Sequence, residues 1–202
     1  AIAREILRQD PGAVVVQKDI RAFMDPVRRV LDEKLYWFVA KNLPELFDHL
    51  FASLQEQGNN VGTIAVLSND YHETKVWEYI KAESPDVIIA THYGSAQVLG
   101  TLREKGLLPG IKIGWLHTDY FEGYFPRISQ RIDRTFLAHP ELESRWLQAG
   151  VAPELIETTG MPVNIPAADG AAGRECLGAI GFDPAVKTVT IACGKEGAGD
   201  FV

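Results

Sequence analysis

The stretch that organises this chain is residues 111–138, IKIGWLHTDYFEGYFPRISQRIDRTFLA. A short apolar run from Ile113 to Leu116 ends at the polar triplet 117–119, and a second strand-like run, 135–138, ends at His139. Short apolar runs that stop at polar residues are typical of buried parallel strands. Because ligands of open α/β sheets bind outside the carboxyl ends of the strands, the sequence predicts a functional cleft at these strand ends.

Strand-like and helix-like segments alternate on both sides of this stretch. The alternation predicts βαβ units and therefore an α/β fold. The strands are predicted at 13–17, 63–67, 87–90, 155–159 and 188–192, and the helices at 1–9, 26–43, 44–57, 73–82, 96–105, 140–149 and 175–180.

The predicted helix at 26–43 begins with Asp25 as its N-cap and Pro26 at its first position. Its apolar residues Leu31, Leu35, Phe38 and Val39 have helical spacing and are expected to face a core. Tyr36 and Trp37 occupy other faces. These two rings either pack in the ordinary way or contact a neighbouring domain or a lipid surface.

Composition excludes several classes of protein. The chain has 202 residues, 46% hydrophobic residues and a net charge of −7, which argues against a dedicated binder of duplex nucleic acid. Its two cysteines, Cys176 and Cys193, form neither a metal-ligand spacing nor a disulfide framework, as expected in a reducing compartment. No apolar run reaches the roughly 18–20 residues of a membrane-spanning helix, so any membrane contact is expected to be peripheral.

Both ends of the chain look cut. Residues 1–7 read as the middle of an amphipathic helix without an N-cap, and the strand at 188–192 with its glycine-rich loop opens a βα unit that stops at Val202.

Three residues at predicted strand ends are candidates for chemistry. Asp119 either positions a sugar hydroxyl or acts as a base, or it caps the next turn. His92 and His117 either titrate usefully near neutral pH or are hydrogen-bonded structural histidines. The i, i+2 spacing of His117 and Asp119 allows both to lie on one side of an extended strand. The histidines show no spacing typical of metal ligands.

Two further segments have a binding character. Aromatic and basic side chains after Asp119 suit an anionic lipid surface, or they form a solvated basic turn; they are Tyr120, Phe121, Tyr124, Phe125, Arg127, Arg131 and Arg134. The loop 194–199, GKEGAG, matches neither the dinucleotide-binding nor the phosphate-loop motif. Its backbone could still approach a diphosphate.

Taken together, four segments resemble the family of monogalactosyldiacylglycerol synthases and processive diacylglycerol glucosyltransferases. They are PDVIIATHYGS (85–95), GWLHTD (114–119), RTFLA (134–138) and TGMPV (159–163). The family is related to the transferase that completes the peptidoglycan lipid intermediate. The TD and GMPV elements are the most specific parts of the resemblance, which covers most of the chain.

The resemblance implies a GT-B fold, in which two Rossmann-like domains, each a parallel sheet with helices on both faces, enclose the active site. Residues 1–164 would form most of the N-terminal acceptor-side domain, 165–173 a linker, and 174–202 the start of the nucleotide-sugar domain. The family's catalytic histidine loop would precede Ala1, so residues 1–202 alone are expected to be inactive.

The resemblance also implies the reaction: transfer of a hexose from a UDP-sugar to a membrane lipid such as diacylglycerol, without a cofactor. Asp119, His117 and His92 would serve the acceptor side, and Gly194, Glu196 and Gly197 the donor diphosphate. The expected location is cytoplasmic and peripheral to an anionic membrane, with no nucleic-acid partner.

This sequence departs from the family pattern in two places. Cys193 and Lys195 interrupt the glycine run of the donor loop, and Tyr93-Gly94 stands where many relatives have a nearby proline, which indicates an unusual acceptor preference.

Three alternatives stay open: a nucleotide-sugar epimerase of the same architecture, a transferase with a soluble acceptor, and a non-catalytic Rossmann-like binding module.

Overall fold

The computed structural model describes residues 2–43, 45–46, 49, 73–118, 125–163, 170–183 and 185–187. The chain divides into two units, residues 12–161 and residues 1–11 together with 162–202, and each is treated by itself. Several predicted segments lie outside the described residues: the strands at 63–67 and 188–192, the loop 194–199 and most of the helix at 44–57.

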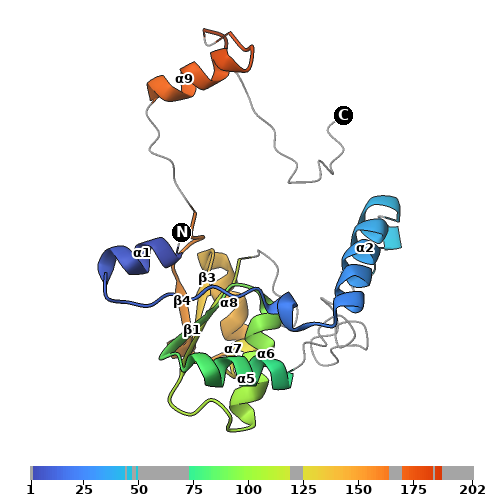
Figure 1. The fold of residues 1–202 in the computed structure, drawn as a ribbon. Coiled ribbons are helices and arrows are strands. Elements are labelled where there is room, and N and C mark those ends of the chain that lie inside the picture. Colours follow the sequence, from blue (N-terminus) through green and yellow to red (C-terminus); the bar gives the residue numbers. More distant parts are fainter. Residues whose placement is uncertain are drawn as a thin grey trace. The chain divides into compact units, whose positions relative to one another are not determined.

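Four parallel strands form the described sheet, in the order β1 (Val87–Ala90), β2 (Lys112–Leu116), β3 (Arg134–Leu137) and β4 (Ile156–Thr158). Figure 1 shows them side by side. Trp115 pairs with Ala90 on one side and with Thr135 on the other. The sheet confirms the predicted α/β, Rossmann-like fold, and all four strands lie within a residue or so of their predicted positions.

Helices connect the strands, as parallel pairing requires. From residue 73 on, the described helices of the unit 12–161 are α5 (Glu73–Glu83), α6 (Tyr93–Glu104), α7 (Phe125–Ser129) and α8 (Pro140–Gln148), and the short 3₁₀ turn η2 (Pro153–Leu155) precedes β4. The chain leaves α8 through Gly150, whose φ of 83° is in the left-handed region that favours glycine. The predicted end of this helix is therefore confirmed.

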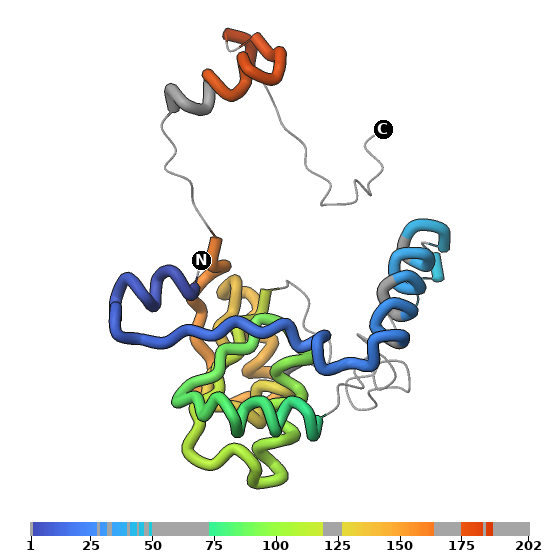
Figure 2. Tube along the Cα trace, in the orientation of Figure 1, coloured from blue at the N-terminus to red at the C-terminus, as the bar shows by residue number. Residues whose placement is uncertain are grey.

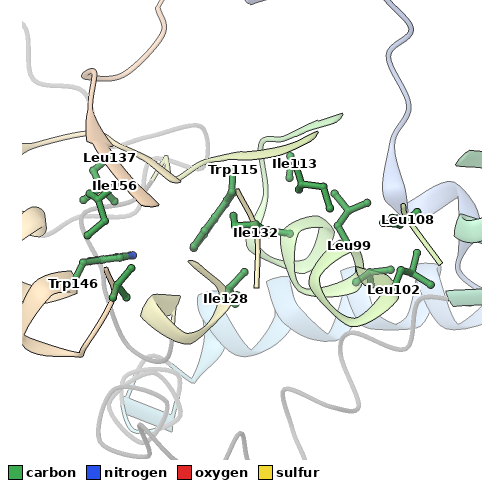
Figure 3. Packing of buried hydrophobic residues seen from close by; sticks show 14 of the residues in the cluster. Leu99, Leu102, Leu108, Ile113, Trp115, Ile128, Ile132, Leu137, Trp146 and Ile156 are labelled. Carbon is green, nitrogen blue, oxygen red and sulfur yellow. The ribbon is translucent and has the colours of Figure 1, made fainter. Parts of the chain in front are cut away.

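The core lies between one face of the sheet and helices α6–α8. Along β2 the alternation of side chains brings Ile113, Trp115 and His117 to this face, and each is about 1% exposed. Figure 3 shows Trp115 extending from β2 toward Ile128 and Ile132, with the leucines of α6 beyond them. Burying side chains of this size stabilises the fold by about 1.5–3 kcal/mol each.

The N-terminal elements of the chain are α1 (Ile2–Gln9), the 3₁₀ turn η1 (Ile20–Phe23) and α2 (Pro26–Asn42), which Figure 2 traces in blue, and α9 (Gly170–Ala179) lies near the other end. The predicted N-cap of α2 is confirmed, because the Asp25 carboxylate accepts a hydrogen bond of 3.0 Å from the Val27 N–H.

Two strand predictions need correction. Residues 13–17 are not a strand in the described structure, and Val14 is 91% exposed. A strand exists only with a hydrogen-bonded neighbour, which apolar β-branched sequence alone does not supply. The run 87–90 is a strand but not a fully buried one: β1 is at an edge of the described sheet, and Val87 and Ile89 are exposed.

Two helix predictions also need correction. Leu31, Leu35 and Phe38 of α2 do not face a core, since each is more than half exposed. The helix predicted at 175–180 begins earlier and ends a residue sooner, since α9 spans Gly170–Ala179.

Candidate functional site

The carboxyl edge of the sheet carries polar residues after each described strand. Thr91-His92 follow β1, His117-Thr118 follow β2, and His139 follows β3 at one residue's distance. Thr159 follows β4, and its N–H donates to the Leu137 carbonyl at 3.1 Å. Polar residues thus follow all four described strands at this edge, and Asp119 lies outside the described residues.

His92 is exposed and serves as the N-cap of α6. Its Nδ1 accepts a hydrogen bond of 3.1 Å from the Gly94 N–H, and its ring stacks on Tyr93 with 4.4 Å between ring centres. An accepting Nδ1 carries no proton, so the neutral ring holds its proton on Nε2. His92 therefore has a structural role that still leaves the imidazole at the surface of the candidate site.

His117 has a different environment, although it follows the neighbouring strand. It is 1% exposed, and its ring lies between those of Trp115 and Trp146, at 5.0 and 4.9 Å from their centres. The backbone N–H of His117 extends the β2–β3 ladder by donating to the Phe136 carbonyl at 2.9 Å. This geometry suits a residue that holds the end of β2 in place rather than one that contacts a substrate.

A buried hydrogen-bond network supports this arrangement. The Ser129 hydroxyl of α7 accepts from the Trp146 indole N–H and from the Thr135 hydroxyl, each at 2.8 Å, and both Ser129 and Thr135 are fully buried. The network links α7, α8 and β3 behind the ring of His117. Sequence reasoning missed it; the i, i+4 spacing of Leu142 and Trp146 in α8 is a local signal that could have placed this helix against the core.

His139 repeats the arrangement of His92 two strands further along, after β3. Its Nδ1 accepts from the Glu141 N–H at 3.3 Å and caps α8. Helix α8 is also fixed to β4, because the Thr158 hydroxyl donates to the Glu143 carboxylate at 2.9 Å. A histidine immediately after a strand and just before Pro140 was the signal for this cap in the sequence.

The basic residues of the predicted membrane loop do not stay together in the structure. Arg127 is exposed on α7. Arg131 pairs with Glu104, the last residue of α6, at 3.1 Å, and Arg134 begins β3 and approaches Glu157 at 3.8 Å. Since α6 runs back from the carboxyl edge, Arg131 and Arg134 lie toward the amino edge, away from the histidines.

The segment itself is also not a simple loop. Helix α7 occupies its middle, and Ile128 and Ile132 are buried in the core. Of the predicted lipid-binding aromatic residues, 120, 121 and 124 lie outside the described residues.

An acidic residue organises the opposite, amino edge of the sheet. One carboxylate oxygen of Asp133 accepts from Arg103 at 2.6 Å and from the Ile113 N–H at 2.7 Å. Partial burial would raise the pKa of this carboxyl, but the hydrogen bonds from Arg103 and Ile113 outweigh it and hold the pKa below its usual value. Asp133 therefore fixes the beginnings of β2 and β3 and takes no part in the candidate site.

Two properties of the described residues limit the kind of site present. Among them, no group of three or more histidine, cysteine or acidic side chains is arranged to hold a metal ion. No helix in the described ranges is both long and apolar enough to cross a bilayer.

Comparison with known families decides the assignment. Residues 2–163 match the family model described as monogalactosyldiacylglycerol (MGDG) synthase. The chain belongs to the monogalactosyldiacylglycerol synthase family. The four-stranded sheet with its polar carboxyl edge is accordingly the N-terminal half of a GT-B fold. Membership of the MGDG synthase family makes the protein a glycosyltransferase of lipid glycosylation. A search of curated proteins found no match.

Proposed function

We propose that this protein transfers a hexose from a UDP-sugar to the hydroxyl group of a membrane lipid such as diacylglycerol. The family match over residues 2–163 carries the proposal. The polar carboxyl edge of the acceptor-side sheet supports it, because this is the edge at which α/β sheets bind ligands. The UDP-sugar is a substrate, and the reaction requires no further cofactor.

The chemistry is a displacement at the anomeric carbon of the sugar. The acceptor oxygen forms a bond to this carbon, the bond to the diphosphate oxygen breaks, and UDP leaves with the electron pair. The acceptor proton passes to a general base. Because negative charge develops on the leaving diphosphate, N–H groups near it accelerate the step, and we assign this role to the loop containing Gly194, Glu196 and Gly197.

The acceptor side is assigned to His92, His117 and Asp119. His92 is exposed, and its Nε2 is the nitrogen through which it would contact an acceptor, since Nδ1 is committed to the helix cap. Asp119 would orient the hydroxyl group. His117, held between two tryptophan rings, would position the end of β2 that carries Asp119.

The proposed location is the cytoplasmic surface of a membrane, with nucleotide sugar, lipid acceptor and anionic lipid as partners. A lipid acceptor requires the enzyme to work at a bilayer.

The test is sugar transfer by the full-length protein to diacylglycerol in vesicles, with radiolabelled UDP-galactose and UDP-glucose as donors. The informative variant is His92→Asn, because asparagine is a good N-cap and keeps α6 intact while removing the imidazole. We expect His92→Asn to lower kcat/KM by at least about tenfold, the low end of what a positioned proton-transfer or hydrogen-bonding group contributes.

The control is Ser144→Ala, at an exposed serine of α8 whose hydroxyl donates to the Glu141 carbonyl of the same helix. It should leave transfer within about twofold of wild type. Equal effects of the two variants on transfer would show that His92 has no role in the acceptor site. Turnover that needs no lipid would establish a soluble acceptor or an epimerase instead, and no turnover with either donor would favour a binding module.

A further inference from the structure

The buried polar side chains of the described core lie together around one tryptophan. Among the residues that the structure describes, these side chains are His117, Ser129 and Thr135. The indole N–H of Trp146 donates to Ser129, which also accepts from Thr135, and the centre of the Trp146 ring lies 4.9 Å from that of His117. Polar groups are therefore concentrated at one place in this core, next to the end of β2.

Such a cluster has a cost that a purely apolar core avoids. Burying polar groups is unfavourable unless they are hydrogen-bonded, and apolar side chains of similar volume would pack without that requirement. A satisfied network, however, fixes one arrangement of its members. Natural sequences depart from the rules of core packing mainly at functional or strained sites. The cluster around Trp146 therefore indicates that the position of a neighbouring group matters for function.

The neighbouring group is the imidazole of His117. The Trp146 ring meets it at an angle of 90°, and the Trp115 ring closes its other side with 5.0 Å between ring centres. Edge-to-face contacts between aromatic rings have a defined geometry. Because the indole N–H is bonded to Ser129 of α7, the Trp146 ring cannot turn without breaking a buried hydrogen bond. The orientation of Trp146 thus fixes that of His117.

His117 in turn fixes where the chain leaves the sheet. Its backbone N–H is bonded to the Phe136 carbonyl of β3, and the partly exposed Thr118 follows directly. Ala90 pairs with Trp115, so the ends of β1 and β2 are in register and Thr118 lies at the same edge as His92. A rotation of the His117 ring would move Thr118 relative to His92.

We propose that Trp146 is a positioning residue for sugar transfer. It holds the His117 ring, and through it the end of β2, in the arrangement that transfer requires. Trp146 is fully buried and meets no substrate itself, so this inference rests on the proposed function. Since donor binding is assigned to the loop 194–199, loss of Trp146 should change turnover rather than the affinity for the nucleotide sugar.

The test is Trp146→Phe in the full-length protein, assayed for transfer to diacylglycerol in vesicles well below the melting temperature. Phenylalanine keeps an aromatic ring in the core and removes the N–H. We expect kcat to fall at least about tenfold, because misplacement by a change away from the chemistry costs up to about a hundredfold. The KM for the UDP-sugar should stay within about twofold. Unchanged kcat in a folded Trp146→Phe protein would overturn the proposal.

The control is a core substitution that leaves the network intact. Leu102 of α6 is 1% exposed, and Figure 3 shows it at the opposite end of the core from Trp146. Leu102→Ala leaves a cavity and should lower the Tm at least as much as Trp146→Phe, while kcat stays within about twofold of wild type. An equal loss of kcat in the control would show that stability alone is responsible. Leu102→Val replaces the alanine variant if the latter does not fold.

Ser129→Ala tests the connection by a second route, because it removes the acceptor and leaves the indole in place. It should lower kcat in the same direction. The double variant Ser129→Ala/Trp146→Phe should lose no more activity than Trp146→Phe alone, since the two residues form one interaction. Losses that multiply would mean that the residues act separately, which contradicts the network.

Amide hydrogen exchange keeps this inference apart from the proposed function, because it reads the strand end without any turnover. Trp146→Phe should speed exchange at His117 severalfold more than at the amides of α6 in the same variant, whereas Leu102→Ala should not. If wild type transfers no sugar but exchange responds in this way, the proposed function fails and the anchoring of the strand end stands. If wild type is active and Trp146→Phe changes neither kcat nor exchange, this inference fails alone.

Discussion

At the scale of single residues, His92 and His117 show how position alone leaves a role undecided. Both follow adjacent parallel strands, and both were candidates for titrating groups. His92 is exposed and accepts the cap hydrogen bond of α6, whereas His117 is enclosed by Trp115 and Trp146. The difference comes from the helix that packs over each position. Of these two histidines, His92 is therefore the one that is exposed in the described structure.

Ser129 is the residue on which the packing behind His117 depends most directly. Ser129→Ala would leave the Trp146 indole N–H and the Thr135 hydroxyl without their buried acceptor. Since each unsatisfied buried donor costs about 1–3 kcal/mol, we expect the free energy of unfolding to fall by about 2–4 kcal/mol. Urea denaturation followed by circular dichroism measures this change.

Ser144→Ala is the matched control, because Ser144 is an exposed serine of α8 that bonds only to the carbonyl of Glu141 in its own helix. It should change the stability by less than about 0.5 kcal/mol. A similar loss in both variants would show that the buried network does not carry the stability.

At the scale of elements, the segment between β2 and β3 combines two roles. Its aromatic and basic composition predicted a surface loop, yet α7 within it buries Ile128 and Ser129 against the sheet. Helix α6 packs closely against this segment, because a Cβ added to Gly100 of α6 would lie 2.9 Å from the Cβ of Arg131. The segment is therefore partly core, and its surface role is limited to the remaining residues.

The amino ends of β2 and β3 are joined by the Asp133 carboxylate. Asp133→Asn removes the charge that Arg103 and the Ile113 N–H neutralise. Because the carboxyl is about one third exposed, we expect a loss of only about 1–2 kcal/mol at pH 7. Thermal unfolding at a series of pH values measures it.

The pH dependence of this loss has a definite sign. The pKa of Asp133 is lowered in the folded protein, so the ionised form stabilises the fold above the unfolded pKa of about 4. The stability difference between wild type and Asp133→Asn should shrink as pH falls below that value through the folded pKa. Asp86→Asn, at an exposed carboxylate, is the control; a difference that persists unchanged in acid would contradict the role given to Asp133.

At the scale of the whole molecule, the buried core residues among those that the structure describes lie between Met24 and Ile156. They belong to the unit formed by residues 12–161. The described hydrophobic core is therefore built from residues of this unit.

Residues 12–161 should consequently fold as a separate polypeptide. We expect a cooperative thermal transition and an α/β circular dichroism spectrum, because hydrophobic burial is the main stabilising term and every described core residue is retained. Ser129→Ala in the same polypeptide should lower its Tm by several degrees. A chain that shows no cooperative transition would mean that the remaining residues complete the core.

The sequence by itself determined the α/β class, the four described strands and the helices α6 and α8, but not α7. It could do so because apolar runs of strand length and helix caps such as Asp25 and Gly150 are local signals. It also predicted the family, since four separate motifs along the chain had to agree. Thus the polar edge of the sheet, though not its geometry, followed from residue order alone.

Only the tertiary structure decided which of those residues are accessible. Val14 and Leu35 carry apolar patterns typical of buried elements yet are exposed, while His117 is polar and buried. Exposure depends on what packs against a residue from elsewhere in the chain, and such contacts leave no local pattern. For the same reason the Ser129 network and the separation of Arg131 from the histidines became visible only in three dimensions.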